Sequence, residues 1–253
     1  MKTYKAYCLD LDGTVYRGKE PINETIQFVH RLQNRGVEPF FVTNNASQTP
    51  DQVMEKLKGF GIHAKRSHII TSAMAAAKYI AKYYPGATVS MIGERGLNDA
   101  LIENGLTIAS TSQEVFVMGI DRGITYDKLA QACLDVRCGA VFISTNSDRA
   151  FPSERGFLPG NGAFTTLIQT STGVKPIFIG KPHAHMLEII QLEHQFAKSE
   201  MVMIGDNYDT DILAGIDFGI DTVHVNTGVT STEEVLTKPK CPTMTMENLL
   251  DWI

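Results

Sequence analysis

The chain contains 253 residues, of which 43% are hydrophobic and 20% are charged, and this composition is ordinary for a soluble protein with a sizeable core. Its length allows one large domain or two modest ones. The net charge of −5 at pH 7 and the lack of a dense lysine and arginine cluster argue against a nucleic acid polymer or a membrane surface as the partner.

The cysteines and the N-terminal segment predict a cytoplasmic protein. The four cysteines form no C-x-x-C pair and have no histidine pattern that would complete a zinc site, and reduced thiols fit a reducing compartment. The segment MKTYKAYCLDLDG has no apolar stretch long enough for a signal peptide, and no run in the chain approaches the ~18 apolar residues of a membrane span.

Apolar segments alternate with helix-like segments along the whole chain. Segments such as VMIG, VFIS and IFIG are continuously apolar, which is typical of parallel strands that are covered on both faces. The predicted strands are 5–11, 38–42, 87–93, 115–120, 140–145, 177–180, 201–205 and 222–226. The predicted helices are 23–34, 50–58, 97–104, 126–136, 184–197 and 210–218. This order of elements predicts an α/β fold.

Polar residues suited to chemistry follow four of the predicted strands, at the point where each strand ends. They are Asp10 with Asp12, Thr43, Lys181 and Asp206. Because ligands of open parallel α/β sheets bind at the carboxyl ends of the strands, these residues predict one site at that edge.

Asp10 and Asp12 stand together in the segment YCLDLDGTVYRG. Residues i and i+2 of a strand point the same way, so both carboxylates are expected to face one site. Carboxylates this close repel each other, so either a cation neutralises them or one stays protonated and serves as an acid. A phosphoryl-transfer site can use both, with Asp10 as nucleophile, Asp12 as acid and base, and the Gly13 N–H near a phosphate oxygen. The alternative is a plain strand end, because Asp-Gly is a common turn pair.

A second acidic cluster, GDNYDTDI, directly follows the apolar segment MVMI. Mg²⁺ prefers octahedral oxygen ligation by one or two carboxylates, retained waters and substrate phosphate. Asp10 and Asp206 can supply the carboxylates, and Asp12 can add its backbone carbonyl. Asp211, together with the neighbouring Asn207, is expected to orient these ligands from behind.

Two further segments offer partners for a phosphate group. In FVTNNAS, the Thr43 hydroxyl and the Asn44 amide suit phosphate oxygens, although these residue types also favour helix caps and turns. In IGKP, Lys181 follows a buried strand, which is an unusual place for a solvated charge. Its ammonium group could offset the charge of the nucleophile and the phosphate.

The order DLDGT, VTNN, GKP and GDNYDTDI resembles the haloacid dehalogenase superfamily of phosphohydrolases, with each motif after a predicted strand. The resemblance implies a Rossmann-like parallel-sheet core and a Mg²⁺ cofactor. It also assigns roles to the matching residues: Asp10 as nucleophile, Asp12 as acid and base, Thr43 and Lys181 as phosphate-binding residues, Asp206 as metal ligand and Asp211 as the acidic residue behind it.

The interval between Asn45 and Lys181 is much longer than the roughly 30 residues of one βα unit. We therefore expect a core made of residues 1–71 and 176–253, with an inserted α/β cap domain at 72–175. Segments such as GERGLNDALIENGL and STNSDRAFPSERGFLPGNGAF resemble the large cap of the 4-nitrophenylphosphatase (NagD-like) branch of the superfamily.

Four polar residues at predicted strand ends of the cap are candidate contacts for the substrate's leaving group, with ordinary turn chemistry as the alternative. They are Asp121, Arg122, Asn146 and Asp148. The cap is also a possible location for a homodimer contact.

The function that the motifs favour is Mg²⁺-dependent hydrolysis of phosphomonoesters through an aspartyl-phosphate. The expected substrates are small phosphorylated metabolites, such as a nucleoside monophosphate, a sugar phosphate or an aryl phosphate. One alternative is a phosphotransferase that passes the phosphoryl group to an alcohol. Another is a phospho-accepting signalling module, although Asp12 argues against it because an adjacent acid and base hastens hydrolysis.

Overall fold

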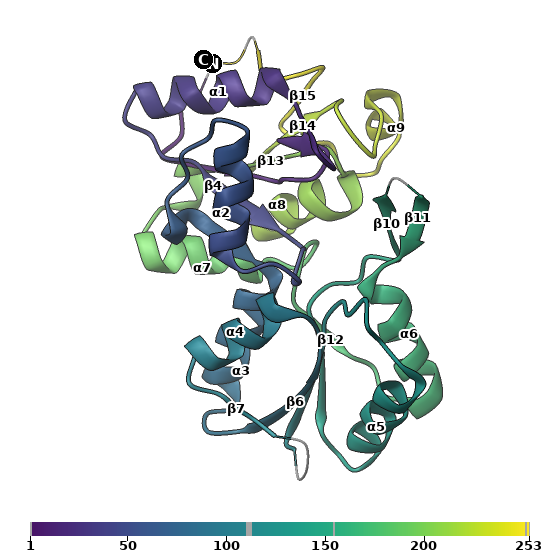
Figure 1. The fold of residues 1–253 in the computed structure, drawn as a ribbon. Helices are drawn as coiled ribbons and strands as arrows, with labels where there is room; N and C mark the ends of the chain where they lie inside the picture. Colours follow the sequence, from purple (N-terminus) through teal and green to yellow (C-terminus); the bar gives the residue numbers. More distant parts are fainter. Residues whose placement is uncertain (1, 110–112, 154, 251, 253) are drawn as a thin grey trace. The chain divides into compact units, whose positions relative to one another are not determined.

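In the computed structural model, which describes residues 2–109, 113–153, 155–250 and 252, the chain folds into two units with a sheet each (Figure 1). The core unit contains the residues up to Thr43, then Pro50–Ile70, then the residues from Lys181 onward. The inserted unit contains Asn44–Thr49 and Thr71–Gly180. Among the described residues, we find no helix with both the length and the apolar character that a membrane span needs.

The core unit is built on a six-stranded sheet in the order β15-β14-β13-β1-β4-β5. Its strands are β1 (Ala6–Leu9), β4 (Phe40–Thr43), β5 (Ile69–Thr71), β13 (Met201–Gly205), β14 (Asp221–Val225) and β15 (Met244–Met246). β1 pairs in parallel with both β4 and β13, and Leu9 lies opposite Phe41 on one side and Ile204 on the other. This register brings the carboxyl ends of the three central strands to the same edge of the sheet.

Helices cover both faces of the core sheet. On one face, α1 (Asn23–Asn34) and α2 (Pro50–Gly59) place apolar side chains such as Phe28 and Leu57 in one cluster with Tyr7 and Leu9 of β1. The other helices of this unit are α7 (His185–His194), α8 (Leu213–Phe218) and α9 (Thr232–Leu236). Its remaining short elements are the hairpin β2 (Tyr16–Arg17) and β3 (Glu20–Pro21), two 3₁₀ turns at Arg66–His68 and Lys198–Glu200, and a π-helical turn at Tyr208–Ile212.

The inserted unit has a five-stranded sheet in the order β12-β9-β8-β6-β7, and every pairing in it is parallel. Its strands are β6 (Thr88–Ile92), β7 (Thr107–Ile108), β8 (Val115–Met118), β9 (Val141–Ser144) and β12 (Ile177–Phe178), and an antiparallel hairpin is formed by β10 (Ala150–Ser153) and β11 (Gly156–Pro159). Its helices are α3 (Ser72–Tyr83), α4 (Arg95–Glu103), α5 (Tyr126–Arg137) and α6 (Asn161–Thr172). Side chains of α5 and α6 share an apolar cluster with Phe116 and Phe142 of the sheet.

The predicted strand 177–180 lies in a different unit from the one expected. Ile177 pairs with Ile143 of β9, and the N–H groups of Ile179 and Gly180 continue this ladder to the carbonyls of residues 144 and 145. The segment therefore completes the inserted sheet, and the chain returns to the core unit only at Lys181. This division differs from the expected boundary at residue 176, because the sequence pattern of an apolar strand does not show which sheet the strand joins.

Other differences lie at the ends of elements. The strand predicted for 5–11 ends at Leu9, because the N–H groups of residues 14, 15 and 16 turn back onto the Leu11 carbonyl. The helix predicted for 210–218 begins earlier, as the π-helical turn at Tyr208. β5, α3, β7, β15, α9 and both hairpins were not predicted from the sequence.

Candidate active site

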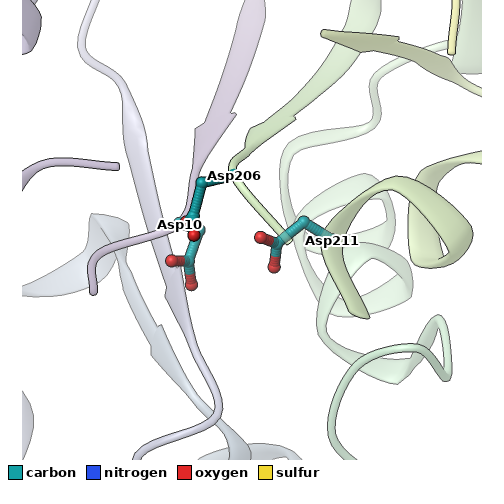
Figure 2. Close-up of side chains that lie close together, drawn as sticks. All are labelled: Asp10, Asp206 and Asp211. Carbon is teal, nitrogen blue, oxygen red and sulfur yellow. The ribbon is translucent and has the colours of Figure 1, made fainter. Parts of the chain in front are cut away.

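Three buried carboxylates meet at the carboxyl edge of the core sheet. Asp10 follows β1, Asp206 follows β13, and Asp211 lies in the π-helical turn. One oxygen of each lies within 4.8 Å of one oxygen of each of the others, and Figure 2 shows the three side chains converging. The sequence predicted Asp10 and Asp206 as close neighbours, and the structure adds Asp211 as a third carboxylate of the same cluster.

The backbone around Asp10 is fixed by the sheet and by the turn that follows it. The Asp10 N–H donates to the Ile204 carbonyl at 2.9 Å, which extends the β1–β13 ladder by one residue. Asp10 is buried, whereas Asp12 is exposed. Gly13 adopts a positive φ of 95°, and its N–H donates to the Tyr16 carbonyl at 2.7 Å. This donor is therefore engaged within the loop, and its approach to a phosphate oxygen stays a prediction.

Asp206 is completely buried, and both of its carboxylate oxygens accept hydrogen bonds. One accepts from the Thr14 hydroxyl at 2.9 Å, and the other accepts from the Val229 N–H at 2.8 Å. A carboxylate oxygen has more than one lone pair, so each can still face a cation. The two hydrogen bonds thus fix the orientation of the Asp206 carboxylate.

Asp211 is positioned by the π-helical turn, an element that often occurs at functional sites. Its Oδ2 accepts from the Asn207 N–H at 3.1 Å, and the Asn207 side chain accepts from the Asp209 N–H at the start of the turn. A side chain on Gly205 would overlap the Asp211 carboxylate, so the glycine permits this close approach. Asn207 therefore supports Asp211 through its backbone.

Lys181 supplies a buried positive charge beside the carboxylates. Its ammonium group forms an ion pair with Asp10, a second with Asp211 at 2.7 Å, and a hydrogen bond to the Val42 carbonyl at 3.0 Å. An ammonium group has three donors, so these acceptors account for all three. Contact with a substrate phosphate would require Lys181 to give up or share one of them.

The charges of this cluster do not balance, because one ammonium faces three carboxylates. Burial and the neighbouring Asp211 raise the pKa of Asp10 well above its usual range, although Lys181 opposes the shift. Burial and Asp211 also raise the pKa of Asp206 to about 6. Burial disfavours the charged form of Lys181, yet the pKa of Lys181 is raised by Asp10 and Asp211. The excess of negative charge and the all-oxygen donor set fit a hard divalent cation such as Mg²⁺.

The Asp12 carboxyl lies in a different environment from the Asp10 carboxyl. Nearby protein atoms reduce its hydration and raise its pKa, while the lysines Lys56 and Lys181 lower it. Lys56, in α2, holds its ammonium 3.4 Å from the centre of the Tyr16 ring. A carboxyl with a raised pKa near the surface is suited to donating and accepting protons.

Thr43 and Asn44 are adjacent in sequence but belong to different units. Thr43 is buried at the carboxyl end of β4, next to β1 in the core sheet. The Asn44 amide donates to both oxygens of Asp148, at 3.1 and 3.3 Å, and its carbonyl accepts from the Ser72 hydroxyl and the Asn146 amide. Asn44 is thus anchored within the inserted unit. Its role as a phosphate-binding residue stays a prediction.

The four candidate leaving-group contacts also have local partners in the inserted unit. The Asp121 carboxylate accepts from the Gly123 N–H at 2.8 Å and pairs with Lys128 at 2.7 Å. Arg122 pairs with Glu94 at 2.7 Å, and its side chain is exposed. Asn146 and Asp148 hold Asn44, as described above. Arg122 is therefore the most available of the four for a ligand.

Three groups that support the site were not identified from the sequence. They are Thr14, Lys56 and the segment 227–230. Thr14 and the segment 227–230 directly follow residues or strands that were singled out, so their signal was the same polar strand-end pattern. Lys56 gave no such signal, because it lies in a helix whose other lysine is an ordinary exposed charge.

Comparison with known proteins finds relatives that match the chain over its whole length. A family model described as haloacid dehalogenase-like hydrolase matches residues 7–107, and a second HAD-hydrolase-like model matches residues 178–252. The 5'-nucleotidase YutF of Bacillus subtilis is 49% identical over 253 residues, covering 100% of this chain and 99% of that protein. An acid sugar phosphatase of Staphylococcus aureus (strain MRSA252) is 50% identical over 254 residues, covering 98% of this chain and 96% of that protein.

A solved structure is similar to the chain throughout its length. It is the crystal structure of a double mutant of a thermostable NPPase from Geobacillus stearothermophilus, with a TM-score of 0.94 and 46% identity. The match covers 100% of this chain and 99% of that one. The chain therefore belongs to the haloacid dehalogenase-like hydrolase family and is one of its phosphatases.

Proposed function

We propose that this phosphatase hydrolyses small phosphomonoesters through an aspartyl-phosphate formed on Asp10, with Mg²⁺ as the cofactor. The observation that carries the proposal is the cluster of Asp10, Asp206 and Asp211 beside Lys181 at the carboxyl edge of the core sheet. Asp10 is the member that follows the central strand β1 and also pairs with the lysine, as a positioned nucleophile requires.

The reaction follows from the two aspartates of the first motif. A carboxylate oxygen of Asp10 attacks phosphorus, and the bond between phosphorus and the ester oxygen breaks. Asp12 gives its proton to the departing oxygen and is left ionised. Asp12 then takes a proton from water, which attacks the phosphorus of the aspartyl-phosphate and releases Asp10 and inorganic phosphate. The raised pKa of Asp12 supports its first step, because a protonated carboxyl is needed there.

The residues that would hold Mg²⁺ are Asp10 and Asp206 through their carboxylates and Asp12 through its backbone carbonyl. Asp211 and Asn207 would support them from behind, since Asp211 also fixes Lys181. The bound ion would act as a Lewis acid that neutralises charge on the phosphate and the carboxylates. Thr43 would contribute its hydroxyl to the phosphate, and Lys181 would keep Asp10 oriented for attack.

The substrate class we propose is a nucleoside monophosphate, a sugar phosphate or an aryl phosphate. The names of the relatives, a 5'-nucleotidase, an acid sugar phosphatase and p-nitrophenyl phosphatases, support this range. Arg122 is the first leaving-group contact to test, followed by Asp121, Asn146 and Asp148. The cytoplasmic location and the homodimer remain predictions from the sequence.

The alternative is a phosphotransferase that uses the same aspartyl-phosphate and passes it to an alcohol. Water and an alcohol would attack at the same position, so the core site accommodates both. Asp12 argues against a long-lived phosphoprotein, because a proton-accepting group beside the phosphoryl group accelerates its hydrolysis.

The test is phosphate release from a panel of phosphomonoesters, with Mg²⁺ and again after chelation. The panel contains 4-nitrophenyl phosphate, nucleoside monophosphates, sugar phosphates, pyridoxal phosphate and phosphoglycolate. We expect metal-dependent release by the native chain and none by D10N, which retains the shape of the side chain but loses the nucleophile. Full activity of D10N would contradict the nucleophile, and transfer to added alcohols in preference to water would favour the phosphotransferase.

A further inference from the structure

The segment 227–230, which follows β14, makes an unusual set of contacts with the catalytic loops. The Val229 N–H donates to the Asp206 carboxylate at 2.8 Å, and the Thr230 N–H donates to the Asp206 carbonyl at 3.2 Å. The Thr230 hydroxyl accepts from the Tyr208 N–H at 3.0 Å, in the turn that carries Asp211. The segment thus contacts both the side chain and the backbone of Asp206. We call residues 227–230 the strap.

The strap is also tied to the loop that follows β1. The Thr227 hydroxyl donates to the Gly13 carbonyl at 2.6 Å. The Thr227 carbonyl in turn accepts from Arg17 Nε at 2.7 Å, on the small hairpin after the first motif. One residue therefore joins the strap to two parts of the loop that contains the proposed nucleophile and acid.

Two glycines enclose the Asp206 carboxylate. A Cβ atom on Gly13 or on Gly228 would overlap the Asp206 side chain, so each backbone approaches it as only a glycine can. Gly13 also requires glycine for its positive φ, whereas Gly228 has an ordinary φ. At position 228 it is thus the close approach to Asp206, and not the backbone conformation, that requires a glycine.

Apolar burial does not explain the path of the strap. The Val229 side chain is 68% exposed, and Gly228 has no side chain, so hydrophobic packing contributes little at the centre of the segment. The N–H of Val229 nevertheless points at a completely buried carboxylate. The contacts of the strap are polar and directed at Asp206 and its neighbours.

We propose that the strap is a positioning element for the metal site: Gly228 lets it lie against Asp206, Thr227 anchors it to the loop after β1, and together they set the affinity for the divalent cation. The inference rests on the proposed function, because it takes Asp206 as a metal ligand. Groups that orient a metal ligand typically change metal affinity by about 10–100-fold when they are removed. The strap would act on Asp206 directly, and Thr227 would act by holding the strap against the loop that follows β1.

The experiment measures Mn²⁺ binding to the full chain by electron paramagnetic resonance, without substrate. We expect G228A to bind Mn²⁺ about 10–100-fold more weakly than the native chain, because its methyl group displaces the Asp206 carboxylate. T227V keeps the size of the side chain but loses the hydroxyl donor, and we expect a loss of about 10-fold. T227S keeps the donor and should restore native affinity.

The controls separate metal binding from stability. G59A changes a glycine with open space around it, at the end of α2, and should leave Mn²⁺ affinity unchanged. Circular dichroism and thermal unfolding establish that each variant is folded. If G228A does not fold, the comparison of T227V with T227S tests the proposal. Hydrolysis by T227V should recover at high Mg²⁺ concentration, since the loss is in affinity.

The outcomes distinguish the two proposals. Native affinity for Mn²⁺ in folded G228A, or equal affinity in T227V and T227S when both differ from the native chain, would overturn the role of the strap. Absence of Mn²⁺ binding by the native chain, with Mg²⁺-independent hydrolysis, would overturn the proposed metal function itself.

Discussion

At the scale of single residues, the site is governed by buried charge. Lys181 is only 2% exposed, and it lies between two carboxylates that are themselves buried. A buried ion pair contributes little net stability, but removing one partner leaves a charge with no compensation. In the proposed mechanism, Lys181 therefore contributes to both stability and catalysis.

We expect K181M to lose stability and activity together. In the absence of metal, unfolding in urea should show a loss of about 3–5 kcal/mol, because Asp10 and Asp211 lose their buried counter-ion. Hydrolysis should fall by about 10²–10³-fold, as is typical when one electrostatic partner of a reacting group is removed. Mg²⁺ should restore part of the stability, since it replaces the missing positive charge.

K240M is the matched control for K181M. Lys240 pairs with Asp217 at 2.6 Å, but both side chains are more than half exposed, so its loss should destabilise the chain far less than the loss of Lys181. Equal destabilisation of the two variants would contradict the role of burial at Lys181.

At the scale of elements, packing between segments determines which side chains have a shifted pKa. His68, in the 3₁₀ turn before β5, stacks on Phe40 of β4 at 4.4 Å between ring centres, and the ring of His194 from α7 lies 5.5 Å away. Burial, His194 and Lys65 lower the pKa of His68, and Glu38 opposes them. Three elements meet at this one imidazole, at the amino end of the core sheet.

This lowered pKa predicts a pH-dependent term in stability. The unfolded state binds the His68 proton at a pKa of about 6.5, above the pKa in the folded state. Between these two values the unfolded chain carries more protons, so the free energy of unfolding falls as the pH falls. The contribution of neutral His68 is fully present above the unfolded pKa and is lost as the pH drops through the folded pKa.

The measurement is the free energy of unfolding of the native chain and of H68Q from pH 8 to pH 5. We expect the loss of stability below about pH 6.5 to be shallower in H68Q, because one of the titrating groups is gone. A slope should remain, since burial also lowers the pKa of His183 and His224. Identical slopes in the two proteins would rule out a contribution from His68.

At the scale of the whole molecule, the chain consists of two units with their own sheets and apolar clusters. The carboxylate cluster and Lys181 belong entirely to the core unit. A ligand that binds only the folded state stabilises the unit that contains its site. Metal binding should therefore raise the stability of the core unit.

We expect Mg²⁺ at 100 times its dissociation constant to stabilise the core unit by about 2.7 kcal/mol. Differential scanning calorimetry with Mg²⁺ and with a chelator should show a shift to higher temperature with the metal. If the units unfold in separate transitions, only that of the core unit should move. D206N removes one of the proposed ligands, so an undiminished shift in that variant would exclude Asp206 as a ligand.

Local features of the sequence determined many of the elements and the residues of the site. The helix 23–34 and the strand 201–205 were predicted with the bounds that the structure has, because their apolar patterns and flanking residues are local signals. The motif residues Asp10, Thr43, Lys181 and Asp206 were found because each follows an apolar strand. The short strands and hairpins were missed because they carry too few residues for a pattern.

Only the tertiary structure decided how these residues are used, because parallel pairing joins segments that are distant in sequence. It assigned the strand Ile177–Phe178 to the inserted sheet, and it anchored Asn44 in the inserted unit. It also brought Asp211 into the carboxylate cluster and laid the strap across Asp206. The sequence by itself thus determined the chemical groups of this phosphatase, and the packing of distant segments determined their partners, their burial and their charges.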